Sequence, residues 1–185
     1  MKDDRHVRNQ DSATVYAEVI RYKLTHGGIA PSIPDLVKLT GYNSTKPVLT
    51  RLEDLDQAGL IKRFPRSPRA IIVKGEQWEP VEPTESELLL VGPITRNVLG
   101  FIRNFAVANS GMVPTLSEIA DAFEWRSCST AKYHVDLLLG CGLIRRVGGH
   151  RSLVLPGKYT INLDDVPAAW RGLVSATVAE TLASA

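Results

Sequence analysis

The sequence contains only two cysteines, Cys128 and Cys141, among its 185 residues. Two cysteines cannot form the network of disulfide bonds that stabilises small secreted domains. The chain also has no run of 18 or more apolar residues, and its charged first dozen residues do not resemble a signal peptide. These absences argue against a disulfide-rich secreted protein and against a membrane-spanning one. We therefore expect a cytoplasmic protein.

Catalytic and metal-binding motifs are missing as well. The sequence has no Gly-rich phosphate loop, no nucleophile elbow and no paired-carboxylate motif. Two cysteines and two histidines lie within one short stretch, but their spacings are not those of zinc modules: Cys128, His134, Cys141 and His150. We predict that the chain is not an enzyme and binds no metal, cofactor or small-molecule ligand.

An internal repeat dominates what is present. When the sequence is shifted by 83 residues, matching residues coincide without a gap: Gly28 with Gly111, Pro31 with Pro114, Ser44 with Ser127, and Gly59-Leu60-Ile61 with Gly142-Leu143-Ile144. Such similarity at a fixed offset indicates two copies of one supersecondary unit.

Each copy begins with two predicted helices. In the first copy, apolar residues from Val15 to Leu24 predict a helix that ends at Gly27-Gly28. A second helix follows in each copy, and its start carries a capping pair: Ser32 with Asp35, and Thr115 with Glu118.

A third helix and a hairpin complete each copy. Ser44 and Ser127 are N-cap candidates, and the buried faces recur at i, i+4 and i+7: Val48, Leu52 and Leu55, then Ala131, Val135 and Leu138. Two short strands follow, 60–64 with 70–73 and 143–147 with 153–155. Three helices and a two-stranded wing predict a fold that is mainly α with small β-wings (α+β), with two tandem winged helix-turn-helix domains.

The domain boundaries follow from this pattern. We predict a disordered N-terminus at 1–12, domain 1 at 13–73, a linker at 74–92, domain 2 at 93–156 and a C-terminal extension at 157–185. The linker contains prolines and five acids against one base, with a helix expected at 85–91. Its net charge of −4 leaves +6 on the rest of the chain, so the positive charge belongs to the two domains.

The second copy resembles the DNA-binding domain of LexA, the bacterial SOS repressor, through the segments 111–120, 126–127 and 142–144. The first copy resembles it more loosely, since Asp35-Leu36 replaces a Glu-Ile pair and Lys46-Pro47 stands where the family has small or polar residues. The resemblance implies DNA binding. The family's self-cleaving protease domain is missing, so we expect neither autoproteolysis nor an SOS role.

The third helices are the predicted recognition helices, because the major groove admits a helix whose N-terminal residues contact base edges. Their exposed early residues are Thr45, Lys46, Leu49 and Thr50, then Cys128, Ser129, Lys132 and Tyr133. The LexA resemblance points to Ser127, Ser129, Thr130, Lys132 and Tyr133, although the family has acids in place of Lys132 and Tyr133.

Structural roles compete with DNA contact at several of these positions. Ser44 and Ser127 fit an N-cap or a phosphate contact, and one residue can do both. Tyr133 fits either DNA contact or packing under the wing, and Leu49 suits a thymine methyl or a protein interface. Basic residues crowd the wings and are expected to contact phosphate: Arg63, Arg66 and Arg69, then Arg145, Arg146, His150 and Arg151.

An apolar stripe follows the second wing, on a helix expected to start near Asp165: Trp170, Leu173, Val174, Val178 and Leu182. It fits packing on the second domain or a homodimer interface.

The leading hypothesis is a bacterial or phage, nucleoid-associated repressor that binds double-stranded DNA at a bipartite site, because the two recognition helices differ. A plasmid or phage replication initiator or partition protein is an alternative. A winged-helix module that binds the transcription machinery is a third.

Overall fold

The computed structural model describes residues 10–64, 69–147 and 153–183. Within these ranges the chain is mainly helical, with three two-stranded sheets, and it divides into two units. The first unit contains the chain up to Gln77 and again from Tyr159, and the second contains Trp78–Lys158. The α+β expectation is therefore confirmed. None of the described helices is both long and apolar enough to cross a lipid bilayer.

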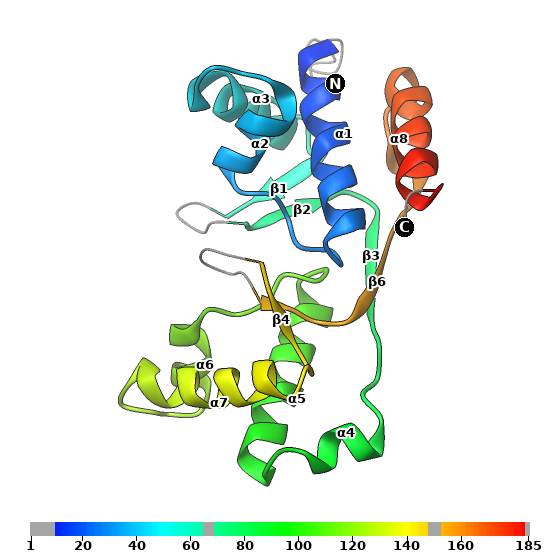
Figure 1. Ribbon diagram of the computed structural model, residues 1–185. Coiled ribbons are helices and arrows are strands. Elements are labelled where there is room, and N and C mark those ends of the chain that lie inside the picture. Colours follow the sequence, from blue (N-terminus) through cyan, green and yellow to red (C-terminus); the bar gives the residue numbers. More distant parts are fainter. Residues whose placement is uncertain (1–9, 65–68, 148–152, 184–185) are drawn as a thin grey trace. The chain divides into compact units, whose positions relative to one another are not determined.

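The first unit begins with three helices, α1 (Gln10–Thr25), α2 (Ile33–Thr40) and α3 (Thr45–Gln57), followed by strands β1 (Ile61–Arg63) and β2 (Ile71–Val73). Helix α1 starts at Gln10, so residues 10–12 are helical and not part of a disordered N-terminus. The strands pair antiparallel, with Ile61 opposite Val73. This is the predicted order of helices and wing (Figure 1).

The second unit repeats that order with α5 (Pro93–Ala108), α6 (Leu116–Ala122), α7 (Cys128–Gly140), β4 (Arg145–Arg146) and β5 (Leu153–Val154). Its buried apolar residues come from all three helices and the wing, including Ile102, Ile119, Val135, Ile144 and Leu153. Both predicted capping boxes are present, because the Ser32 and Thr115 side chains accept from the backbone N–H of Asp35 and Glu118.

The segment predicted as a linker has regular structure. It contains β3 (Glu76–Pro80) and α4 (Glu85–Leu89), and β3 pairs with β6 (Gly157–Ile161). Trp78 is buried in the second unit against Gly157, where an added Cβ would lie 2.4 Å from atoms of the indole ring. Glycine is therefore required at 157 for this close approach. The acidic composition of this segment predicted a linker, but the segment contains a strand with two buried side chains, Glu76 and Trp78.

From Tyr159 onward, the C-terminal extension belongs to the first unit. After two short 3-10 helices, η2 (Leu163–Asp165) and η3 (Ala168–Trp170), helix α8 (Arg171–Ala183) packs beside α1 (Figure 1). Trp170 and Val174 join the hydrophobic core that α1 and α3 form, and Val178 packs against it. The expectation that this apolar stripe packs on the second domain is therefore wrong. Of the apolar stripe that also fits a homodimer interface, only Leu173 and Leu182 are exposed.

Candidate nucleic-acid interface

Helix α7 has one buried and one exposed face. Ala131, Val135 and Leu138 are buried, as the sequence pattern predicted. The opposite face is open to solvent and presents Ser129, Lys132, Tyr133 and Asp136. Exposed polar side chains therefore line one side of the helix that is predicted to enter the groove.

The start of α7 is capped by its own serine. The Ser127 hydroxyl accepts a hydrogen bond from the backbone N–H of Ser129 at 3.1 Å. Cys128 and Thr130 are also exposed in this first turn. A helix N-terminus with backbone donors facing solvent suits a phosphate, so the capping role leaves phosphate contact open.

Helix α3 presents a similar face. Thr45, Lys46 and Thr50 are exposed, and the Thr50 hydroxyl donates to the Lys46 carbonyl at 3.2 Å. Leu49 is half-buried, so it is less available to DNA than its neighbours. Ser44 occupies the N-cap position, but its side chain makes no capping hydrogen bond. The exposed Ser44 hydroxyl therefore has no capping role, whereas the Ser127 hydroxyl caps its helix.

Lys132 and Tyr133 differ in how they are held. The Lys132 ammonium pairs with the Asp136 carboxylate one turn later, at 2.5 Å. Tyr133 is 60% exposed and meets the edge of the His134 ring, at 5.1 Å between centroids. Tyr133 does not pack beneath the described part of the wing, which favours the alternative of DNA contact.

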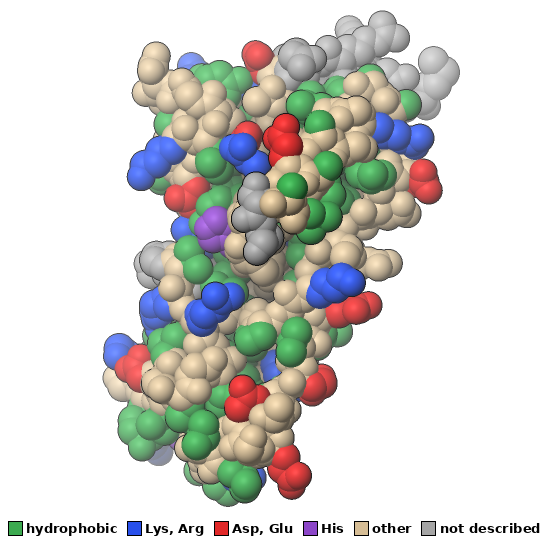
Figure 2. Space-filling model, turned by 45° about the vertical axis from the view of Figure 1, so that its right-hand side comes forward, with side chains coloured by type: hydrophobic (Ala, Val, Ile, Leu, Met, Phe, Trp, Pro, Cys, Tyr) green, Lys and Arg blue, Asp and Glu red, His purple; other side chains and the backbone are tan. Residues whose placement is uncertain are grey.

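The wing cations fall into three groups. Arg145 and Arg146 on β4 are exposed, and Arg63 on β1 is half-buried. Arg66, His150 and Arg151 lie outside the described residues. On the face shown in Figure 2, basic side chains lie among acidic ones, so positive charge there is local and not a broad field.

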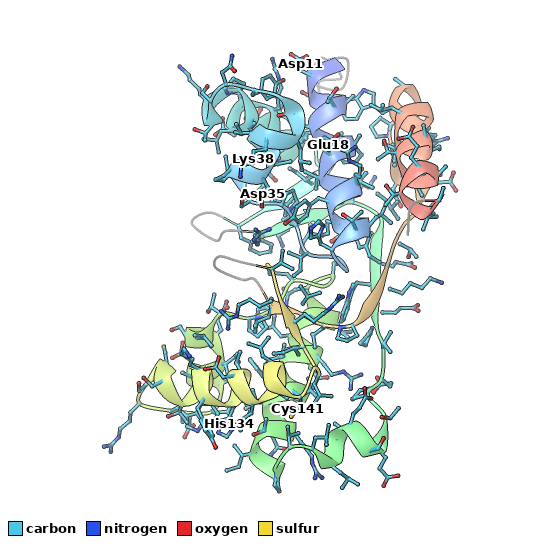
Figure 3. All side chains as sticks on the ribbon, viewed as in Figure 1. Asp11, Glu18, Asp35, Lys38, His134 and Cys141 are labelled. Carbon is cyan, nitrogen blue, oxygen red and sulfur yellow. The ribbon has the colours of Figure 1, made fainter. Side chains whose placement is uncertain are left out.

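Arg69 is a correction to the predicted wing contacts. Its side chain is only 8% exposed and binds within the first unit, to the Asp35 carboxylate at 3.0 Å, the Tyr22 hydroxyl at 2.9 Å and the Ala30 carbonyl at 3.2 Å. Asp35 lies on α2 (Figure 3). Burial alone raises the pKa of this carboxyl, but hydrogen bonds from Ser32 and the charge of Arg69 outweigh it and lower the pKa. Arg69 thus holds α2 and the wing together.

His134 is buried on α7, and Cys141 is the C-cap residue just after that helix (Figure 3). Its Nδ1 lies 2.8 Å from the Thr95 hydroxyl of α5, so it joins the two helices. Both cysteines are free, and the described residues contain no group of three or more His, Cys, Asp or Glu placed to hold a metal.

Acidification is expected to destabilise the second unit through His134. Burial lowers the pKa of His134 in the folded state, whereas the unfolded value is about 6.5. The unfolded chain then binds more protons than the folded one as pH falls through about 6.5, so stability is fully present above that pH and is lost below it. Urea unfolding of the second unit at pH 7.5 and 5.5 measures this. His134→Gln is expected to flatten the difference, and an equal pH dependence in the variant contradicts the assignment.

Sequence reasoning left out two exposed acidic residues, Glu53 on α3 and Asp136 on α7. They occupy equivalent positions, since 83 residues separate them, as they separate the two copies throughout. The 83-residue offset of the repeat, applied to polar as well as apolar residues, is the sequence signal that identifies these two positions as equivalent.

Comparisons with known proteins place these two units in context. The family model of the LexA DNA binding domain matches residues 14–70 and again residues 93–151. These ranges contain both α3 and α7, the helices with the exposed polar faces.

Curated relatives carry the same description. A LexA repressor from Mycobacterium bovis (strain BCG / Pasteur 1173P2) is 30% identical over 128 residues, which cover 65% of this chain and 52% of the relative. One from Mycobacterium sp. (strain KMS) is 33% identical over 103 residues, covering 56% and 39%. One from Mycobacteroides abscessus is 40% identical over 58 residues, covering 31% and 26%. The chain thus matches about half or less of the length of these relatives. No solved structure matched significantly.

Proposed function

The chain belongs to the LexA DNA binding domain family, and on this premise we propose that it is a double-stranded-DNA-binding transcriptional regulator that acts as a repressor. The observation that carries the proposal is the repeat itself. Two copies of the family's domain each present a polar helix face to solvent, on α3 and on α7. Such a face on the third helix of a helix-turn-helix contacts base edges in the major groove.

The residues divide by the contact they are suited to make. Lys46, Thr50, Ser129, Lys132 and Tyr133 are exposed side chains on the two helices and serve base contact. Exposed or half-buried groups at the helix starts and wings serve phosphate contact, which positions the protein without reading sequence: Ser44, Thr45, Ser127, Thr130, Arg63 and Arg146. Arg69 is omitted because its guanidinium is bound within the first unit.

The operator is expected to be bipartite and non-palindromic. The two helices carry different residues at equivalent positions, such as Leu49 against Lys132 and Thr50 against Tyr133. Each domain therefore selects its own short sequence. Because both domains lie on one chain, binding of the first raises the effective concentration of the second, and two weak half-sites make one tight site. A repressor bound in this way blocks promoter DNA by occupancy.

Selection of binding sites from random duplex DNA tests the proposal, with Lys132→Ala and Arg146→Ala compared in parallel. Lys132→Ala is expected to change the preference at a few bases and to weaken the preferred site by about 1–3 kcal/mol. Arg146→Ala is expected to weaken all sequences alike and to reduce the salt dependence by about one counterion. Glu85→Gln on the exposed part of α4 is the control.

A two-part motif in the parent selection supports the proposal. If no motif is enriched, and only weak binding that salt abolishes is seen, the proposal is contradicted. That result favours a protein-interaction module instead, for which the exposed Leu89, Leu90 and Ile94 of the second unit provide apolar surface.

A further inference from the structure

Each recognition helix carries an acidic residue at the same position of its exposed face. Glu53 is the ninth residue of α3 and Asp136 is the ninth residue of α7. Both are exposed, with 46% of the Asp136 side chain open to solvent. Neither acid was among the residues expected to contact DNA, and acids are repelled by phosphate.

Helix stability does not explain these acids. Carboxylates stabilise a helix near its N-terminus, whereas both residues lie in the C-terminal half of a thirteen-residue helix. Asp136 does pair with Lys132, but a lysine that precedes its acid by four residues is the less favourable order. An exposed pair of this kind contributes little to stability. The position of the two acids therefore needs another reason.

Their spacing supplies one. On α7 the exposed residues Ser129, Lys132, Tyr133 and Asp136 follow the pattern i, i+3, i+4 and i+7. Lys46, Leu49, Thr50 and Glu53 follow the same pattern on α3, although Leu49 is half-buried. A homeodomain recognition helix presents its base-contacting residues in the major groove with this same spacing. Glu53 and Asp136 thus stand at the last of these four positions on the two helices.

A carboxylate at such a position has a defined chemical preference. It accepts a hydrogen bond from the N4 amino group of cytosine, whereas guanine and thymine offer it only acceptor atoms in the major groove. Adenine has an N6 amino donor, but the adjacent N7 acceptor repels a carboxylate, which can only accept. This preference lowers the affinity for DNA that lacks cytosine at that position.

We propose that Glu53 and Asp136 are specificity-determining residues that select cytosine at one position in each half of the operator. The inference rests on the proposed function, because it concerns the same two helix faces. The two copies provide an internal check, since each acid governs only its own half-site. Exchanging a carboxylate for an amide changes the preferred partner from cytosine to adenine, whose N6 and N7 pair with Asn or Gln.

The test is site selection from random duplex DNA with the full chain, Asp136→Asn and Glu53→Gln. The parent is expected to enrich cytosine at one position in each half-site, by roughly tenfold or more over adenine. Asp136→Asn is expected to change that base to adenine in one half only, and Glu53→Gln in the other half only. Asp56→Asn removes the same charge from an exposed site of α3 outside the pattern and is expected to leave the motif unchanged.

Circular dichroism checks that every variant keeps the parent's helix content. If Asp136→Asn and Glu53→Gln enrich the same motif as the parent, the two acids do not select bases and the inference is overturned, while the proposed function stands. A parent selection without any motif overturns both. A shift from cytosine to adenine confined to the matching half-site supports the inference.

Discussion

Glu76→Gln is expected to lower the free energy of unfolding of the first unit by about 3–5 kcal/mol. Glu76 forms an ion pair with Lys23 at 2.7 Å, and the two side chains are 1% and 2% exposed. Removing the carboxylate charge leaves the lysine ammonium buried without its counterion, which costs far more than the loss of a surface pair.

The surrounding contacts explain why both groups are tied in place. The Lys23 ammonium also donates to the Ile71 carbonyl at 3.0 Å, and the Tyr159 hydroxyl donates to Glu76 at 3.0 Å. Burial lowers the pKa of Lys23, an effect that Glu76 opposes, and burial raises the pKa of Glu76 against the influence of Lys23. This network joins α1, β2, β3 and β6 within the first unit.

A double variant separates the buried charge from a general loss of packing. Lys23→Met combined with Glu76→Gln removes both charges and is expected to recover most of the stability lost by Glu76→Gln alone. Glu79→Gln, an exposed position on the same strand, is expected to change stability by less than about 0.5 kcal/mol. Denaturant unfolding, monitored by hydrogen exchange of amides in the first unit, gives the free energy of unfolding of each variant. A loss below about 1 kcal/mol for Glu76→Gln contradicts this account of the pair.

Local patterns in the sequence predicted the core of each domain. The periodic residues Val48, Leu52 and Leu55 are buried in α3, and the capping pairs at Ser32 and Thr115 form as expected. These features depend on neighbours within about one turn of helix, so sequence alone contains the information. The exposed recognition faces follow from the same periodicity, because the side opposite a buried stripe faces solvent.

Long-range contacts could not be predicted in this way. Glu76 looks like one of several solvated acids in a linker, and only its partner 53 residues earlier makes it a buried residue. Arg69 looks like a wing cation, but Asp35, Tyr22 and Ala30 turn it inward. The amphipathic pattern of α8 predicted that it must be buried, yet nothing local to the helix indicates that α1 is the helix it packs against.

Trp170→Ala is expected to destabilise the first unit by about 3–5 kcal/mol and to leave the second unit unchanged. Trp170 is 4% exposed and belongs to the core that holds α1 and α3. Its ring lies 5.7 Å from that of Tyr16 between centroids, at an angle of 50°. Truncation to alanine removes this large apolar contact and leaves a cavity where α8 joins the unit, so both the transfer and the cavity terms contribute.

The location of the effect matters as much as its size, because Trp170 lies more than 90 residues beyond the first wing in the chain but packs in the first unit. Hydrogen exchange resolved by residue is expected to show faster exchange in α1, α3 and α8, with α5 and α7 as in the parent. Leu173→Ala is the matched control, since Leu173 lies three residues further along the chain, on α8, and is 39% exposed; its cost is expected to be well below that of Trp170→Ala. Faster exchange in α5 and α7, or none in α1, would contradict the assignment of the C-terminal helix to the first unit.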